Sequence, residues 1–170
     1  LKIVRGDCGD QRLIPALIKR ADILIPLAAL VGADRCHQDP TLAFHLNFQA
    51  VQDLCFYASK DQPILFPCTN SGYGKGETGI CNEHTPMEPI SYYGKTKKSA
   101  EYEVMRRENS ISFRFATLFG MSPRMRWGLL TNYLVKQAVT EKYIVLFESS
   151  FKRNFLSVHD AARVFLHAIE

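Results

Sequence analysis

The sequence predicts an α/β fold built on a doubly wound parallel sheet. Short apolar runs rich in β-branched residues alternate with longer segments of helical period. This alternation is typical of parallel strands whose faces are covered by helices. The 170 residues, of which 46% are hydrophobic and 22% charged, also suffice for one globular domain with a buried core.

The expected strands are the short apolar runs, and each is separated from the next by a helical or loop segment. They cover residues 1–4, 23–27, 64–67, 111–115 and 144–147. A first helix is expected over residues 11–20. Pro15 lies inside it and removes a backbone hydrogen-bond donor, so we expect this helix to be short or bent.

The helix after the second strand has the clearest signals. Asp39 can cap it and Pro40 suits its first position. Apolar residues then recur every four positions and predict a face packed on the sheet: Leu42, Leu46, Ala50, Leu54 and Ala58. A further helix is expected over 92–109. The last helix is expected to begin near Ser157, which precedes Asp160 by three residues as in a capping box.

Composition favours a soluble cytoplasmic protein with a small anionic ligand. No apolar run approaches the roughly 20 residues of a membrane span, and residues 1–7 lack the pattern of a signal peptide. The five cysteines and five histidines show no metal-ligand spacing, so we expect free thiols and no metal. A net charge of +4 is modest, which argues against a nucleic-acid partner.

Two residues one helical turn apart suggest acid–base chemistry. Tyr93 and Lys97 are four positions apart on an expected helix, so they share one face. A phenol ionises near pH 10, and a nearby ammonium lowers its pKa toward the range of a general base. Taken alone, this spacing is more often an accident of a surface helix than a catalytic pair.

Thr69 adds a hydroxyl at the end of the strand expected over 64–67. It opens the stretch Thr69-Asn70-Ser71-Gly72-Tyr73-Gly74. In open parallel sheets, ligands bind beyond the carboxyl ends of the strands. Thr69, Tyr93 and Lys97 are therefore expected on one side of the molecule.

These motifs resemble the extended short-chain dehydrogenase/reductase superfamily, and within it the NAD-dependent nucleotide-sugar epimerases and dehydratases. The resemblance rests on Thr69 four residues before a Tyr-Gly pair and on Tyr-x-x-x-Lys in Ser91-Tyr92-Tyr93-Gly94-Lys95-Thr96-Lys97. It implies a Rossmann-like fold in which Thr69, Tyr93 and Lys97 are catalytic. It also implies NAD as the cofactor, with NADP possible, and a nucleotide-diphosphate sugar as the substrate.

Further motifs match the same family in order along the chain. The resemblance implies that the cofactor is bound by Asp7, Leu27, Ala28, Ala29, Asn47, Tyr93 and Lys97. It implies that the substrate is bound by Asn70, Ser71, Arg126 and Arg153. Arg126, with Arg124, could instead form a solvated basic turn. Arg114 to Gly120 resemble the strand that follows the catalytic helix, and Arg153 opens a stretch ending at Asp160 that resembles the segment whose arginine grips the diphosphate.

The family's glycine-rich cofactor loop is not found in the sequence. The glycines of 72–79 do not replace it, because Gly76 rather than Ser or Thr follows Lys75. We therefore expect residues 1–170 to be a single partial NAD(P)-binding domain, a central fragment of a homodimeric parent, with 121–170 leading into its substrate-binding part. The fragment alone is expected to be inactive, poorly soluble or swapped into oligomers, and weak in NAD binding.

The residues after Thr69 bear on the reaction. Dehydratases of this family resemble one another in carrying Asp-Glu there, since elimination of water needs a further acid and base. Here Asn70 and Ser71 stand in those places. The sequence therefore favours an epimerase that uses tightly bound NAD. A dehydratase or reductase of the same superfamily and a catalytically silent nucleotide-binding relative stay open as alternatives.

Overall fold

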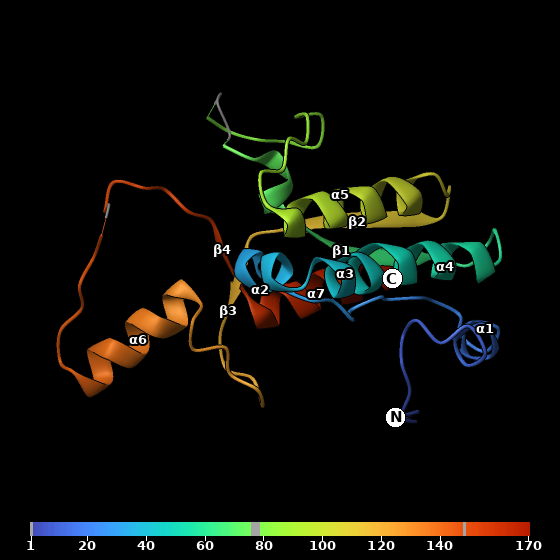
Figure 1. Cartoon of the computed structure of the whole chain (residues 1–170), viewed down its shortest axis with the longest axis horizontal. Helices are drawn as coiled ribbons and strands as arrows, with labels where there is room; N and C mark the ends of the chain where they lie inside the picture. Colours follow the sequence, from blue (N-terminus) through green and yellow to red (C-terminus); the bar gives the residue numbers. More distant parts are fainter. Residues whose placement is uncertain (1, 76–78, 148) are drawn as a thin grey trace. The chain divides into compact units, whose positions relative to one another are not determined.

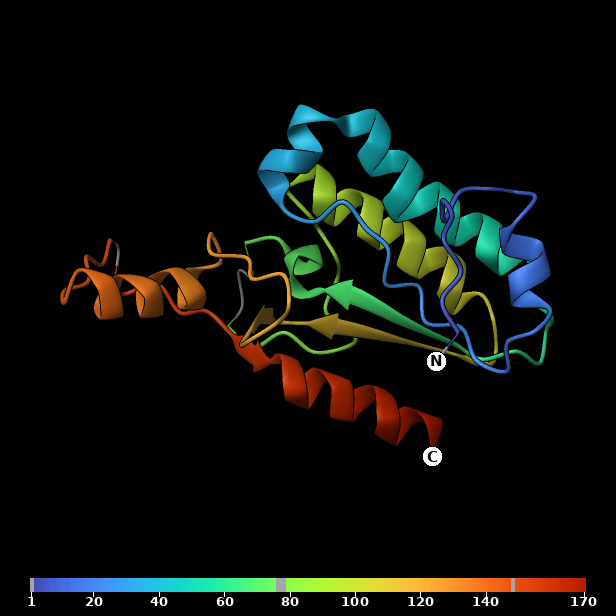
Figure 2. The same cartoon turned by 90° about the horizontal axis from the view of Figure 1, so that it is seen from below.

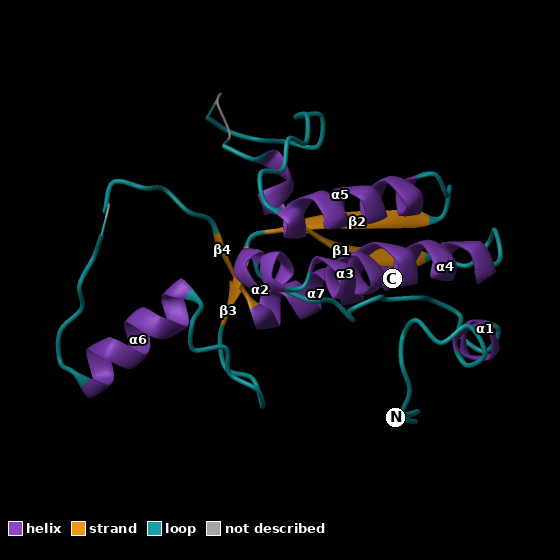
Figure 3. Cartoon of the chain, viewed as in Figure 1, coloured by secondary structure: helices purple, strands orange, loops and turns teal. Residues whose placement is uncertain are grey.

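A computed structural model describes residues 2–75, 79–147 and 149–170 and shows helices together with a few short strands (Figures 1 and 3). The elements, in order, are α1 (Ile14–Ile18), α2 (Ala33–Gln38), α3 (Pro40–Phe44), the π-helix η1 (His45–Gln49), α4 (Ala50–Tyr57), β1 (Ile64–Thr69), the 3₁₀-helix η2 (Asn70–Tyr73), α5 (Tyr92–Met105), β2 (Ser110–Phe115), β3 (Thr117–Phe119), α6 (Leu130–Thr140), β4 (Phe155–Ser157) and α7 (Val158–Ile169). The predicted α/β fold with parallel strands is confirmed.

The chain divides into two compact units, Leu1–Arg114 and Phe115–Glu170. In the first unit β1 lies between β2 and a parallel bridge at Leu24. The bridge is held by hydrogen bonds of 2.9 Å from Leu24 N to Pro63 O and from Leu65 N to Leu24 O. Figure 2 shows β1 and β2 running in the same direction, with α3, α4 and α5 on one side of them.

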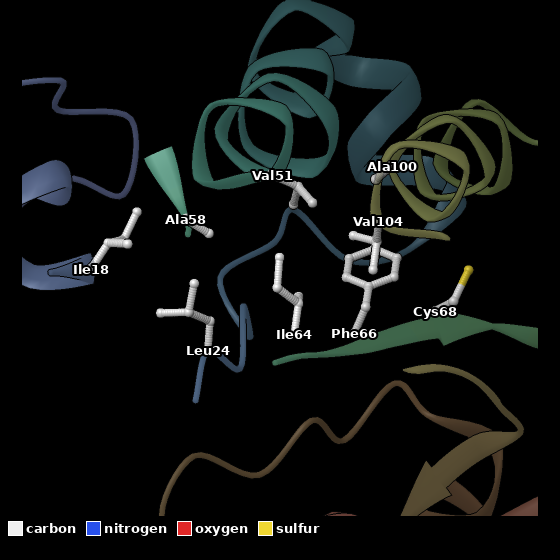
Figure 4. Packing of buried hydrophobic residues seen from close by; sticks show 9 residues of the cluster. All are labelled: Ile18, Leu24, Val51, Ala58, Ile64, Phe66, Cys68, Ala100 and Val104. Atoms are coloured by element: carbon white, nitrogen blue, oxygen red, sulfur yellow. The ribbon is translucent and has the colours of Figure 1, made fainter. Parts of the chain in front are cut away.

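The core of the first unit fills the space between β1 and the helices. Alternate residues of β1 point to the helix side, because side chains alternate along a strand. Figure 4 shows Ile64 and Phe66 directed toward Val51 of α4 and Val104 of α5. Ile64, Phe66 and Val104 are each fully buried. This packing fixes the position of α5 on the strand that ends at Thr69.

The expected helix from Pro40 onward forms with the expected cap, but its middle is wider than an α-helix. Asp39 accepts a hydrogen bond from Leu42 N at 2.9 Å, and Pro40 occupies the first turn. The chain then passes through the π-helix η1 before α4 resumes the regular geometry. π-Turns of this kind are often found at functional sites, and this one contains Asn47.

Several expected elements differ from the structure. Residues 2–4 and 144–147 form no strand, and Leu1 lies outside the described residues. Ile3 and Phe147 are 78% and 87% exposed. An apolar run does not form a β-strand when no partner strand is present to pair with it. The expected strand 23–27 reduces to the bridge at Leu24, and the helix expected over 11–20 shortens to α1, with Pro15 in its first turn.

The second unit contains a short parallel pair and one packed helix. β3 and β4 pair with Thr117 opposite Phe155 and Phe119 opposite Ser157. Ser157 then caps α7 by accepting a hydrogen bond from His159 N at 3.2 Å, so the expected start of the last helix is confirmed. β3 lies within the 114–120 stretch that the resemblance implied to be a strand, whereas β4, α2 and α6 were not predicted from the sequence. Three-residue strands are too short to show an alternating pattern.

Arg107 closes the end of α4, and its replacement by alanine should destabilise the fold. Its guanidinium donates to four carbonyl oxygens, those of Cys55, Ala58, Ser59 and Gln62. A cation at a helix C-terminus satisfies carbonyls that the helix cannot, so we expect Arg107→Ala to lower the free energy of unfolding by about 1.5–3 kcal/mol. Chemical denaturation of the full-length protein measures this loss.

The neighbouring Arg106 supplies a matched control for this prediction. Its side chain is 65% exposed and pairs with Glu103 at 3.6 Å. Such exposed pairs contribute little, so Arg106→Ala should change the free energy of unfolding by less than about 0.5 kcal/mol. Equal losses in the two variants would show that the carbonyl contacts of Arg107 contribute no special stability.

Candidate active site

Helix α5 presents one buried face to the sheet, and Lys97 lies on it. Ser91 caps the helix by accepting a hydrogen bond from Gly94 N at 3.1 Å. Four residues with helical spacing form the buried face: Lys97, Ala100, Glu101 and Val104. Tyr93 lies one turn before Lys97 and is half-buried against a cluster that contains Cys36 and Ala43. The expected arrangement of Tyr93 and Lys97 on one helix is therefore observed.

The Lys97 ammonium is buried over an aromatic ring. Its Nζ lies 4.0 Å from the centroid of the Phe66 ring, and the residue is 3% exposed. Burial lowers the Lys97 pKa to about 8, although the nearby Cys68 and Glu101 favour the charged form. Lys97 is therefore still mostly protonated at pH 7. Among the described residues, no carboxylate lies within ion-pair distance of this ammonium.

Thr69 is the last residue of β1 and the cap of η2. Its Oγ1 accepts a hydrogen bond from Ser71 N at 3.2 Å, and the residue is 7% exposed. This bond turns the chain at the carboxyl end of the strand, where the sequence analysis expected Thr69. Asn70 and Ser71 follow in the first turn of η2; Asn70 is half-buried and Ser71 is exposed.

A glycine allows η2 to approach the start of α5 closely. A β-carbon on Gly94 would lie 3.2 Å from the Ser71 carbonyl oxygen and 2.8 Å from Pro89 Cβ. Only a residue without a side chain leaves this approach undisturbed. Gly94 directly follows Tyr93, so the segment that begins at Thr69 packs beside the turn that carries Tyr93.

Asn47 holds the backbone that follows the Leu24 bridge. Its Oδ1 accepts from Leu30 N at 2.8 Å, and its Nδ2 donates to Leu30 O at 3.0 Å and to Thr96 Oγ1 at 3.3 Å. The residue is 1% exposed, so its amide is fully occupied inside the protein. Its contribution to cofactor binding would therefore be to position the 27–31 segment.

The other residues implied by the resemblance are distributed over both units. Asp7 is exposed, and its Oδ1 accepts a hydrogen bond from Gly9 N at 2.8 Å. Leu27 and Ala28 are exposed and Ala29 is half-buried. Arg126 and Arg153 lie in the second unit and are exposed. The binding roles of all six residues stay predictions.

Three further residues, which the sequence did not single out as site residues, form one network around α5. Glu101 pairs with Arg114 at 2.8 Å, and Arg114 donates to the Tyr73 hydroxyl at 3.0 Å. Glu101 stands four positions after Lys97, so the same helical spacing that links Tyr93 to Lys97 would have placed it on the buried face. Within the described residues, no His, Cys, Asp or Glu cluster is arranged to bind a metal.

Comparison with known protein families shows to which family this chain belongs. The family model described as NAD dependent epimerase/dehydratase matches residues 1–170. The chain belongs to this family. The resemblance that began with Thr69, Tyr93 and Lys97 is confirmed, and it extends over both units. In the described part of the chain, no helix has the length and apolar character needed to cross a bilayer.

Two curated relatives carry different activities in their names. A Bacillus subtilis (strain 168) protein described as an uncharacterized UDP-glucose epimerase is 29% identical over 161 residues, covering 88% of this chain and 49% of the relative. A dTDP-glucose 4,6-dehydratase of Streptomyces antibioticus is 32% identical over 100 residues, covering 58% of this chain and 30% of the relative. The chain thus spans at most about half the length of these relatives.

A solved structure agrees with the fold. The UDP-glucuronic acid 4-epimerase from Bacillus cereus, in complex with UDP-glucuronic acid and NAD, is 25% identical, with a TM-score of 0.82. The match covers 98% of this chain and 55% of that protein. The family is NAD-dependent, and this neighbour contains NAD.

The residues of this chain fit a bound NAD. Among the described residues, the Lys97 ammonium has an aromatic ring for a neighbour but no ion-pair partner, which leaves its donors for the hydroxyl groups of a ribose. Ala28 is exposed and Ala29 is half-buried, and both side chains are small. Lys97, Tyr93 and the 27–29 segment would hold the cofactor, and NAD would supply hydride transfer.

Proposed function

We propose that the protein is a nucleotide-sugar epimerase that uses tightly bound NAD for transient hydride transfer at a sugar carbon. One observation carries the proposal: Tyr93 lies one turn before the buried Lys97 on a helix packed against β1, and β1 ends at Thr69. These are a phenol, an ammonium and a hydroxyl, the groups needed to remove a proton from an alcohol and hold its oxygen.

Each of these residues has a distinct role in the proposal. Tyr93 in its ionised form takes the proton of the sugar hydroxyl and later returns it. Lys97 favours that ionised form through its charge and holds the cofactor ribose, while Thr69 donates a hydrogen bond to the same sugar oxygen. NAD, when bound, would supply the transient hydride transfer at the sugar carbon.

The proposed substrate class is based on two arginines that could bind phosphates and on two polar side chains that could bind a sugar. A nucleotide-diphosphate sugar carries two phosphates, for which Arg126 and Arg153 offer forked donors. Asn70 and Ser71, at the carboxyl end of β1, can bond to sugar hydroxyls. The relatives are named for UDP-linked or dTDP-linked sugars, which supports this class.

Epimerisation is favoured over elimination by the side chains of η2. Residues 70–73 are Asn, Ser, Gly and Tyr, and none of them has a carboxyl group that could remove or deliver the second proton. The dehydratase reading is kept as the second candidate because a relative at 32% identity is named a dTDP-glucose 4,6-dehydratase. A reductase or a silent nucleotide-binding relative fits the chain less well.

Product analysis in D₂O separates the two candidates. The full-length protein is incubated with UDP-glucose and, separately, with dTDP-glucose, and the products are followed by NMR. Epimerisation should give an inverted sugar without deuterium on carbon, because the hydride returns to the carbon that lost it. A 4-keto-6-deoxy product that carries solvent deuterium would show a dehydratase instead.

Loss of the Thr69 hydroxyl should slow the reaction modestly. The expected loss in Thr69→Ala is one hydrogen bond, about 0.5–1.5 kcal/mol, which corresponds to roughly a two- to twelvefold lower kcat/KM. Thr69→Ser keeps the hydroxyl and the bond from Ser71 N, so it should retain most of the activity. If both variants lose activity equally, the γ-methyl group rather than the hydroxyl is the part that matters.

A further inference from the structure

Arg114 connects α5 to the segment that precedes it in the sequence. Its Nε donates to Glu101 Oε1 at 2.8 Å, and the two side chains are 21% and 9% exposed. Glu101 lies one turn after Lys97 on the buried face of α5. A sheltered pair of this kind fixes the plane of the guanidinium relative to the helix.

The other end of the guanidinium reaches the polypeptide between β1 and α5. Nη1 donates to the Tyr73 hydroxyl at 3.0 Å and to the Glu83 carbonyl at 3.3 Å. The guanidinium carbon is 5.1 Å from the centroid of the Tyr73 ring. The Tyr73 hydroxyl in turn donates to the Asn82 carbonyl at 3.0 Å. Arg114 thus joins α5 to η2 and to the turn that begins at Asn82.

The turn at residues 82–85 depends on these links. Its own hydrogen bonds are short-range and mostly at the surface: Asn82 N to Thr85 Oγ1 at 3.0 Å, His84 N to Asn82 Oδ1 at 3.0 Å and Thr85 N to Asn82 O at 3.1 Å. Exposed local bonds of this type open easily. The contacts from Tyr73 and Arg114 attach the turn to the buried part of the unit.

The charge of Glu101 explains why the guanidinium is needed. Among the described residues, Glu101 Oε2 is buried without a hydrogen-bond partner, and the Lys97 ammonium lies on the same helix face. A buried carboxylate requires a cation. Arg114 supplies that cation, so Glu101 need not draw Lys97 away from Tyr93.

We propose that Arg114 is a positioning residue for the sugar end of the substrate. Glu101 holds the Arg114 guanidinium in place. Through its bonds to the Tyr73 hydroxyl and the Glu83 carbonyl, Arg114 in turn holds η2 and the 82–85 turn against α5. Asn70 and Ser71 then hold their binding arrangement before the sugar arrives. The proposal rests on the proposed function for the identity of the substrate. The contacts of Arg114 in the described structure are to Glu101, Tyr73 and Glu83, so its role here is to hold other residues in place.

Loss of this positioning should affect KM more than kcat. When only a fraction of the molecules has the competent arrangement, the apparent affinity falls by that fraction, while the bound complex reacts as before. Tyr73→Phe keeps the ring under Arg114 but removes both hydroxyl bonds. We expect KM for UDP-glucose to rise about tenfold, with kcat within about twofold of the parent protein.

Amide hydrogen exchange tests the positioning without any substrate. The full-length protein is compared with Tyr73→Phe, Arg114→Gln and the control Arg106→Gln, whose arginine is exposed, directly follows α5 and pairs with Glu103 of that helix. We expect the amides of Asn82, His84 and Thr85 to exchange about tenfold faster in the first two variants and at the parental rate in the control. If Arg114→Gln does not fold, the exchange rates of Tyr73→Phe alone are compared with those of the parent protein and the control.

The results distinguish positioning from simple stabilisation. Faster exchange together with a raised KM and a nearly constant kcat supports the proposal. Unchanged exchange in Tyr73→Phe would overturn it, as would a lower melting temperature and lower kcat at unchanged KM. Because hydrogen exchange needs no substrate, the exchange measurement tests the positioning by Arg114 even if the protein proves to catalyse another reaction of the family.

Discussion

Replacing Tyr93 with phenylalanine should lower kcat for nucleotide-sugar interconversion by at least about 10²-fold, the usual contribution of a general acid–base group. The substitution removes only the hydroxyl. The ring still packs beside the cluster that contains Cys36 and Ala43, so the fold and the binding of NAD should change little. Steady-state kinetics with UDP-glucose, together with calorimetry for NAD, measure the two effects.

Tyr92 provides the matched control, since it is the adjacent tyrosine and packs against the same cluster. Tyr92→Phe removes the same atom one position away and should keep parental activity within about twofold, because surface or packing changes of this size cost little. Equal activity of the parent and Tyr93→Phe, with the same pH dependence, would remove Tyr93 from the mechanism and favour a silent nucleotide-binding relative.

Replacing Lys97 with methionine should weaken function and stabilise the ligand-free protein at the same time. The variant loses the charge that favours the Tyr93 phenolate and the donors for the ribose, so both kcat and NAD affinity should fall. It also no longer buries an ammonium over Phe66. A gain in stability combined with a loss of activity identifies a residue retained for its chemistry.

The sign and pH range of the stability change follow from the Lys97 pKa. The folded value of about 8 is below the ordinary 10.5, so the folded state binds this proton less tightly than the unfolded state. The charged form therefore destabilises the fold below pH 8 by up to about 3 kcal/mol, and this cost declines as pH rises from about 8 to about 10.5. Lys97→Met should be more stable at pH 7, with an advantage that shrinks at higher pH.

Denaturant unfolding at several pH values checks this prediction, with Lys95→Met as the control. Lys95 is exposed on the same helix, so its replacement should change stability by less than about 0.5 kcal/mol at any of these pH values. A Lys97→Met variant that is less stable than the parent at pH 7 would contradict the assignment of a costly buried ammonium.

The positions of the three catalytic candidates could be predicted because each rests on a local rule. An apolar run followed by polar residues places Thr69 at the end of β1, and a spacing of four places Tyr93 and Lys97 on one helix face. The cap at Asp39 was equally local. Predictions of this kind need no knowledge of distant contacts.

The parts that could not be predicted depend on contacts between distant segments. Residues 144–147 have the composition of a strand but no partner among the described strands. Arg114 and Tyr73 are 41 positions apart, so nothing in their spacing indicates that they meet. The approach of Ser71 to Gly94 is likewise a tertiary contact, which the sequence shows only as a glycine in a helix.

The absorbance of reduced nicotinamide during a single turnover tests the central claim most directly. The full-length protein is loaded with NAD and mixed with UDP-glucose, and the parent is compared with Tyr93→Phe. The proposed function predicts that NADH forms and is consumed in the parent, and that its formation is slower by at least about 10²-fold in Tyr93→Phe, although both bind NAD. NADH formation at the same rate in the two proteins would contradict it.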